Sequence, residues 1–138
     1  MGEPAPVRIT ADTNLLVRIL TEDDERQAAT ARDELAEAEL VAITLPTLCE
    51  LSWVLIRGYK HPAADVSRAV RHLLDSETVA ADRAAAEAGL AMLDAGGDFA
   101  DGVIAFEGRR LGADVLVSFD ATAVELVSAS GEAARLLV

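Results

Sequence analysis

Two aspartates at an expected helix start mark the stretch of this chain best suited to chemistry. The segment Gly96-Gly97-Asp98-Phe99-Ala100-Asp101 ends one apolar-periodic run and begins the next. Asp98 therefore stands at the expected N-cap, and Asp101 follows three residues later on the same side of the first turn. Such a pair can simply cap free backbone N–H groups and complement the helix dipole. The positions of three further acids favour a chemical role instead.

Asp12 and Asp120 each follow an expected strand directly, although either could cap the helix that comes next. Glu50 is the only charged residue in the segment 45–56, a helical pattern that is apolar nearly all round. A carboxylate is rarely buried without a partner. We therefore expect Glu50 to face a polar cavity.

These acids lack neutralising neighbours in the sequence. No Lys or Arg lies within three residues of Glu50, Asp101 or Asp120, and the same holds for Asp98. Like charges held a few ångströms apart raise one another's pKa and oppose folding. A hard divalent cation removes this conflict, because ligand sets made only of oxygen suit Mg²⁺ or Mn²⁺. The five candidate acids are Asp12, Glu50, Asp98, Asp101 and Asp120.

Short apolar strands alternate with helical patterns along the whole chain. Strands are expected at 7–11, 41–43, 78–80, 115–119 and 135–138, of which 115–119 is the clearest buried strand. Helices are expected at 15–20, 22–39, 46–59, 63–75, 82–94, 98–111 and from 121 onwards. This alternation predicts an α/β sandwich around a parallel sheet. Ligands of such sheets bind outside the carboxyl ends of the strands, where Asp12 and Asp120 are expected.

Length and composition predict a single domain spanning residues 1–138. Hydrophobic residues make up 51% of the 138, enough for a substantial core. We find no signal-peptide pattern and no apolar stretch that could cross a bilayer, so we expect a cytoplasmic protein. One cysteine excludes an intramolecular disulfide framework and a Cys-rich zinc site. We assign Trp53, Phe99 and Phe106 to the core.

The charge balance is acidic, with a formal net charge of −12. This argues against non-specific nucleic-acid binding through bulk charge. The segment 57–72 is an exception, because four basic residues there oppose the single acid Asp65. A solvated helix face and a contact with a polyanion explain this segment equally well. The four basic residues are Arg57, Lys60, Arg68 and Arg71.

With these residues in place, the chain resembles the PIN-domain family, specifically the VapC-type toxin ribonucleases of type II toxin–antitoxin systems. The resemblance rests on four short motifs that recur in the same order over nearly the full length. They are Ala11-Asp12-Thr13-Asn14, Leu48-Cys49-Glu50-Leu51-Ser52-Trp53-Val54-Leu55, Asp98-Phe99-Ala100-Asp101 and Ser118-Phe119-Asp120. The resemblance implies a PIN-like three-layer α/β/α sandwich with a central, mostly parallel sheet of four to five short strands.

The resemblance also implies an Mg²⁺- or Mn²⁺-dependent endoribonuclease. Asp12, Glu50, Asp101 and Asp120 would form its metal-binding acidic core, with Asp98 as a more variable fifth acid. Asn14 would orient the neighbouring carboxylates, and Ser118 would lie near the last acid. Activated water would then hydrolyse the phosphodiester and leave a 5′-phosphate and a 3′-hydroxyl. Asp98 and Asp120 are both candidates for the general base, and the four basic residues are candidates for contacts with the RNA backbone.

Partners follow from the same resemblance. Such proteins are homodimers that a cognate VapB-like antitoxin inhibits, and they reach operator DNA only through that antitoxin. Two other interpretations stay open, namely an RNA-processing PIN nuclease outside a toxin–antitoxin pair and a non-catalytic PIN-like binding module. A phospho-acceptor signalling domain is disfavoured, because it needs a Lys after a late strand and the only Lys is Lys60.

Overall fold

Three short strands form the first parallel sheet of the protein, whose computed structural model describes residues 7–138. Strand β2 (Leu40–Ala42) lies in the middle, between β1 (Arg8–Thr10) and β3 (Val79–Ala80). Ile9 lies opposite Val41 in this register. The strands fall within a residue or two of their expected positions. Residues 1–6 of the expected domain lie outside the described range.

Six helices accompany this sheet and follow the sequence pattern closely. They are α1 (Thr13–Thr21), α2 (Glu25–Glu37), α3 (Leu45–Trp53), α4 (Ala63–Asp75), α5 (Arg83–Asp94) and α6 (Phe99–Arg110). Several begin at an aspartate whose carboxylate accepts a backbone N–H of the first turn. Asp12 caps α1, Asp24 caps α2 and Asp82 caps α5 in this way. Local capping therefore explains where these helices start.

The sequence pattern predicts one regular helix over 46–59, but α3 ends at Trp53. It passes into a π-helical turn, η1 (Val54–Gly58), in which the N–H of Tyr59 donates to the carbonyl of Val54 at 3.1 Å. The phenol of Tyr59 donates to Asp23 at 2.9 Å and ties the end of this turn to the α1–α2 loop. The π turn widens the helix directly after the segment that carries Glu50.

The main core lies around the first sheet and includes side chains from six helices and the π turn. Val41 from the sheet packs with Leu51 of α3, Leu90 of α5 and Phe99 of α6, and all four are buried. Phe99 thus lies in the core as expected. Because Phe99 and Leu51 belong to one buried cluster, the N-terminus of α6 packs against α3.

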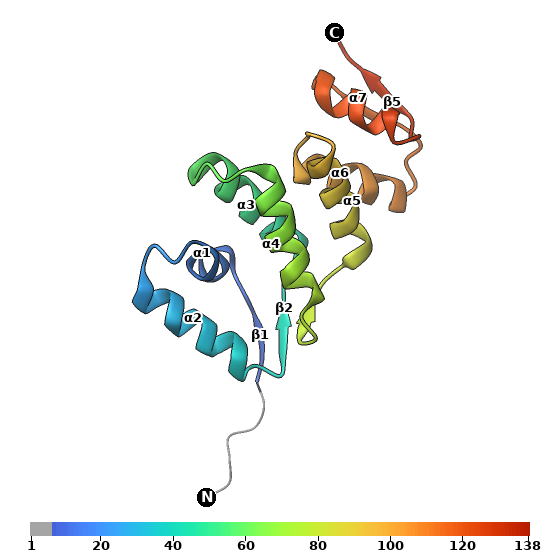
Figure 1. Cartoon of the computed structure of the whole chain (residues 1–138). Coiled ribbons are helices and arrows are strands. Elements are labelled where there is room, and N and C mark those ends of the chain that lie inside the picture. The colour runs from blue at the N-terminus through green and yellow to red at the C-terminus, as the bar shows by residue number, and fades with distance from the viewer. Residues whose placement is uncertain (1–6) are drawn as a thin grey trace, which may run out of the picture.

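A second, smaller unit completes the chain. Strands β4 (Leu116–Ser118) and β5 (Ala134–Leu136) form a separate two-stranded parallel sheet, connected by α7 (Ala121–Ala129). Figure 1 shows α7 and β5, in red, beyond α5 and α6 as seen from β1 and β2. This unit packs against Met92 of α5 and Ala105 of α6.

The α/β fold with parallel strands is thus confirmed, but its five strands are divided between two sheets. The expectation that 115–119 is a buried strand is wrong, since Val117 is 42% and Phe119 74% exposed. The physical reason is the division itself: β4 has one neighbouring strand and lacks a second. No helix among residues 7–138 is long and apolar enough to span a bilayer.

Candidate active site

The first turn of α6 presents two carboxylates, as the sequence predicts. A glycine turn precedes it, in which Gly96 adopts a φ of +99° and the N–H of Gly97 donates to the carbonyl of Met92 at 2.9 Å. Asp98 occupies the N-cap position, yet its side chain makes no capping hydrogen bond. Asp98 therefore keeps its carboxylate free, and Asp101 lies one turn further along the helix.

Asp101 is partly buried, and its charge is unfavourable there. Burial raises the pKa of its carboxyl, and the negative charges of Asp98 and Asp120 raise that pKa further. These three acids, from the start of α6 and the end of β4, therefore share one electrostatic neighbourhood. A bound proton or cation would relieve the repulsion between them.

Asp120 lies between strand β4 and helix α7. Its carboxylate caps α7 by accepting the N–H of Ala123 at 3.1 Å. The hydroxyl of Ser118 accepts the N–H of Asp120 at 2.9 Å and so fixes the turn that follows β4. Ser118 thus lies directly beside the last acid, where the motif predicted it.

Asp12 lies at the carboxyl end of β1. It caps α1 by accepting the N–H of Leu15 at 2.9 Å, and Asn14 is exposed two residues further on. Glu50 is exposed on α3, with its immediate neighbour Leu51 buried. Glu50 thus avoids a desolvation cost by reaching solvent, and not by facing an enclosed polar cavity.

None of the five candidate acids takes part in the ion pairs formed within residues 7–138. Arginine therefore does not neutralise them in the described part of the chain. Asp12 and Glu50, however, do not contribute to the pKa shift of Asp101. Within the described range, no three His, Cys, Asp or Glu side chains are grouped as a metal site. Asp98 and Asp101 thus lie in the first turn of α6 and Asp120 follows β4, whereas Asp12 follows β1 and Glu50 lies on α3.

The model of the PIN domain matches residues 9–127, which include every candidate acid. The chain belongs to the PIN domain family. Among curated proteins none matches it.

One solved structure similar to this PIN domain is the Sarcin-Ricin loop cleaving toxin VapC20 of Mycobacterium tuberculosis. It shares 22% identity, and the match covers 90% of this chain and 95% of VapC20 with a TM-score of 0.43.

The candidate acids suit a divalent cation by their chemical type, although no three of them are grouped as a metal site within residues 7–138. The candidate ligands are all carboxylates, and Mg²⁺ and Mn²⁺ prefer oxygen ligands. Burial, and then the negative charges of Asp98 and Asp120, raise the pKa of Asp101, so ionising this carboxyl is unfavourable without a cation. The donor set therefore fits such a cation, which would have to draw on acids from more than one element.

The basic residues of segment 57–72 divide into two pairs. Arg71 of α4 forms an ion pair with Asp94 of α5 at 2.7 Å, which lowers the pKa of that carboxyl. Arg68 pairs with Asp65 on its own helix. Arg57 and Lys60 are exposed and form no ion pair with residues 7–138. This second pair is the better placed for an external phosphate.

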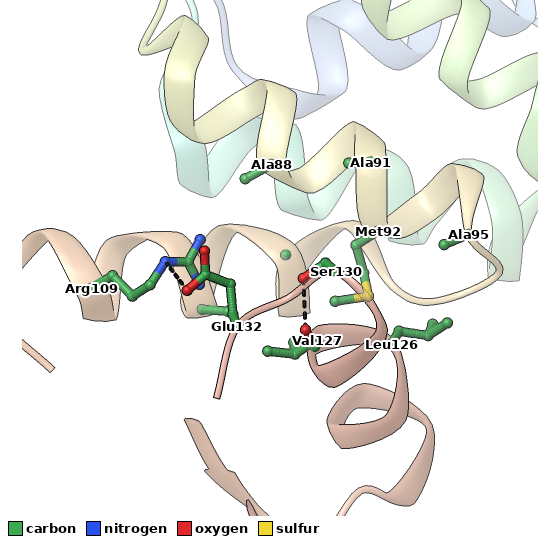
Figure 2. Close-up of a pocket in the computed structure, with 11 residues that line it drawn as sticks. Ala88, Ala91, Met92, Ala95, Arg109, Leu126, Val127, Ser130 and Glu132 are labelled. Carbon is green, nitrogen blue, oxygen red and sulfur yellow. Dashed lines mark hydrogen bonds and ion pairs between the residues drawn. The ribbon is translucent and has the colours of Figure 1, made fainter. Parts of the chain in front are cut away.

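One cavity in the described part of the chain is lined by none of the five candidate acids. It has a volume of about 260 Å³ and lies between α7 and the helix pair α5–α6. Figure 2 shows alanines of α5 on one wall and Leu126 and Val127 of α7 on the other. Its one carboxylate, Glu132, pairs with Arg109 at 3.6 Å. We assign this cavity to the loose packing of the smaller unit.

Trp53 departs most clearly from the sequence prediction. It was assigned to the core, but its side chain is 63% exposed. The sequence contained a usable signal, because Trp53 lies three residues after the exposed Glu50 and so shares its helix face. Apolar periodicity alone did not distinguish the two sides of a helix this rich in apolar residues.

Proposed function

We propose that this PIN domain is a VapC-like toxin, an endoribonuclease that depends on Mg²⁺ or Mn²⁺ and hydrolyses RNA phosphodiester bonds. Membership of the PIN family supports this proposal. The observation that carries it is a set of five carboxylates that form no ion pair with residues 7–138, of which Asp98 and Asp120 raise the pKa of the partly buried third, Asp101. A purely structural role does not explain acids that repel one another.

Four acids would hold the cation in this proposal, namely Asp12, Glu50, Asp101 and Asp120. When bound, a divalent cation there offsets charge on the phosphodiester oxygens and acidifies water. The chain's own part is to hold the carboxylates against their mutual repulsion. Asn14 would orient the side chain of Asp12, and Ser118 already fixes the backbone at Asp120.

Proton transfer needs a carboxylate within reach of the attacking water. Asp98 and Asp120 are the candidates, and Asp98 has the side chain that is not used for capping. Attack of water forms a new P–O bond and breaks the bond from phosphorus to the 3′ oxygen. The proton taken up by the carboxylate passes to that leaving oxygen. The products are a 5′-phosphate and a 3′-hydroxyl.

Contacts with the RNA backbone would come from Arg57 and Lys60, since both are free of internal ion pairs in the described chain. Arg68 and Arg71 would contribute only after leaving Asp65 and Asp94. We further propose that the protein forms a homodimer inhibited by a cognate VapB-like antitoxin, through which alone it would reach operator DNA.

Incubation of the purified protein with structured RNA and Mg²⁺ tests the proposed activity. We expect cleavage that EDTA abolishes, products with 5′-phosphate ends, and a loss of at least 100-fold in rate for Asp101→Asn. Asp33→Asn on the exposed face of α2 is the matched control and should cleave like the parent.

Equal cleavage by Asp101→Asn and the parent would contradict the proposed mechanism. If the parent cleaves no RNA at all, the PIN domain is a non-catalytic binding module.

A further inference from the structure

We propose that the face of α3 and η1 around Trp53 is a nucleotide-binding subsite, with the base on the indole and the neighbouring phosphate at Arg57 and Ser52. The proposal rests on RNA being the substrate and adds where one of its nucleotides binds. Three independent features of this face support it.

The first feature is a small cavity with an unsatisfied hydroxyl. The cavity has a volume of about 60 Å³ and lies between α3–η1 and the start of α6, where Ser52 and Arg57 face Asp98 and Ala100. Ser52 is only 2% exposed, and its Oγ has no hydrogen-bond partner within residues 7–138. A buried hydroxyl without a partner is costly, so native proteins rarely keep one without a reason. A ligand oxygen in this cavity would satisfy it.

The second feature is the exposed indole of Trp53, which lines the same cavity. A tryptophan usually buries most of its large apolar surface. Aromatic side chains left exposed beside a charged groove are the platforms on which single-stranded nucleic acids stack their bases. Trp53 lies between Glu50 and Arg57 on the helix, at intervals of three and four residues. The intervening π-helical turn is a rare form that occurs often at functional sites.

The third feature is the positive charge at the cavity. Arg57 has no internal ion pair in the described chain and can form a bidentate contact with phosphate. Asp98 does not cap α6, so the first-turn amide of Ala100 has no side-chain acceptor at the positive end of the helix. The carboxylate of Asp98 opposes an anion in the same place. We therefore expect modest affinity that falls steeply with salt.

The chain carries its own reporter, because Trp53 is its one tryptophan. We would titrate the intact protein with a mixed-sequence RNA pentanucleotide in EDTA, so that binding is measured without cleavage. Intrinsic fluorescence should be quenched to saturation. Anisotropy of the labelled RNA should report at least fivefold weaker binding for Trp53→Leu and for Arg57→Gln, and near-parental binding for Trp53→Phe. Leu111→Ala, which removes another exposed apolar side chain, should bind like the parent.

Ser52→Ala separates binding from folding. It should weaken RNA binding about threefold while the melting temperature stays equal or rises, because the buried hydroxyl without a partner is gone. A parallel loss of binding and stability would assign Ser52 a structural role and overturn its part in the proposal.

Three outcomes would overturn the subsite as a whole. If RNA leaves the emission unchanged and Trp53→Leu binds RNA and cleaves it like the parent, the subsite is absent and the ribonuclease proposal stands. If the emission shifts with protein concentration and not with RNA, this face joins two copies of the chain. A parent that neither binds nor cleaves RNA would remove both proposals together.

Discussion

The two sheets of this PIN domain differ in how well they are supported. The three-stranded sheet is covered by a large continuous core, to which α1, α3, α4, α5 and α6 contribute buried side chains and α2 the partly buried Leu35. The two-stranded sheet has a cluster of only three buried residues, Met92, Ala105 and Val127. Two-stranded sheets are marginal by themselves. Stability is therefore concentrated in one unit, while the candidate acids are spread over both.

The distribution of the acids makes this difference relevant to function. Asp12 and Glu50 belong to the well-packed unit, and Asp120 belongs to the weakly packed one. Asp98 and Asp101 lie at the start of α6, which contacts both cores. A site built from all of these acids would depend on how the smaller unit is placed on the larger. Assembly of the site and stability of the fold can therefore be disturbed separately.

Core truncations should give the largest effects and should differ between the units. Leu51→Ala removes a fully buried side chain of the main core and should lower the free energy of unfolding by about 2–5 kcal/mol. Leu126→Ala, the same change in the partly buried side of the small cluster, should cost clearly less. Urea unfolding of both variants measures the difference. Equal losses would show that the two units are packed equally well.

Hydrogen exchange should separate the units within the native protein. Amides that bond across the first sheet, such as that of Val41, should exchange only through global unfolding. The amides of β4 and β5 should exchange faster by orders of magnitude, because one neighbouring strand and a small core protect them. Mass spectrometry of peptic peptides resolves this. Uniform protection of all five strands would contradict the claim that the two sheets differ in stability.

The charge of Asp101 should make stability depend on pH. Its pKa is raised in the folded state, so its ionisation costs stability as pH rises from the ordinary carboxyl pKa through the raised one. Asp101→Asn should therefore raise the melting temperature at pH 7 and change it little at pH 3. The same variant should lose cleavage. A lower melting temperature at pH 7 would mean that this carboxylate stabilises the fold.

The surface ion pairs should matter least. Arg71→Gln breaks the pair with Asp94, in which the two side chains are 42% and 44% exposed. Because solvent and salt screen such pairs, the melting temperature should fall slightly in low salt and hardly at all in 0.5 M NaCl. RNA binding should stay near the parental value, since Arg71 is already engaged within the chain. A large loss of binding would instead place Arg71 in the RNA contact.

Much of the architecture was predictable from local sequence signals. Capping aspartates such as Asp12 and Asp82 fixed the helix starts, and the glycine pair before Asp98 fixed the start of α6. Short β-branched runs between the helices indicated a parallel sheet. These signals depend only on residues that are neighbours in the sequence, so the helix starts and strands could be predicted from them.

The predictions that were wrong concern features that depend on contacts between residues distant in sequence. The run 115–119 is as apolar as a buried strand, but its exposure is decided by which strands lie beside it. Trp53 has the spacing of a core residue, yet the part of α3 that carries it is left uncovered. Glu50 was expected to face a polar cavity, yet it is exposed on α3. The spacing of apolar residues shows that one face of a helix or strand is apolar, but it does not show which other element covers that face.

The central claim is that acids from both units bind one divalent cation, and Mn²⁺ titration calorimetry tests it most directly. Asp12→Asn in the larger unit and Asp120→Asn in the smaller should each weaken Mn²⁺ binding by at least tenfold, with Asp33→Asn unchanged. Parental affinity in the Asp12→Asn variant would contradict the claim.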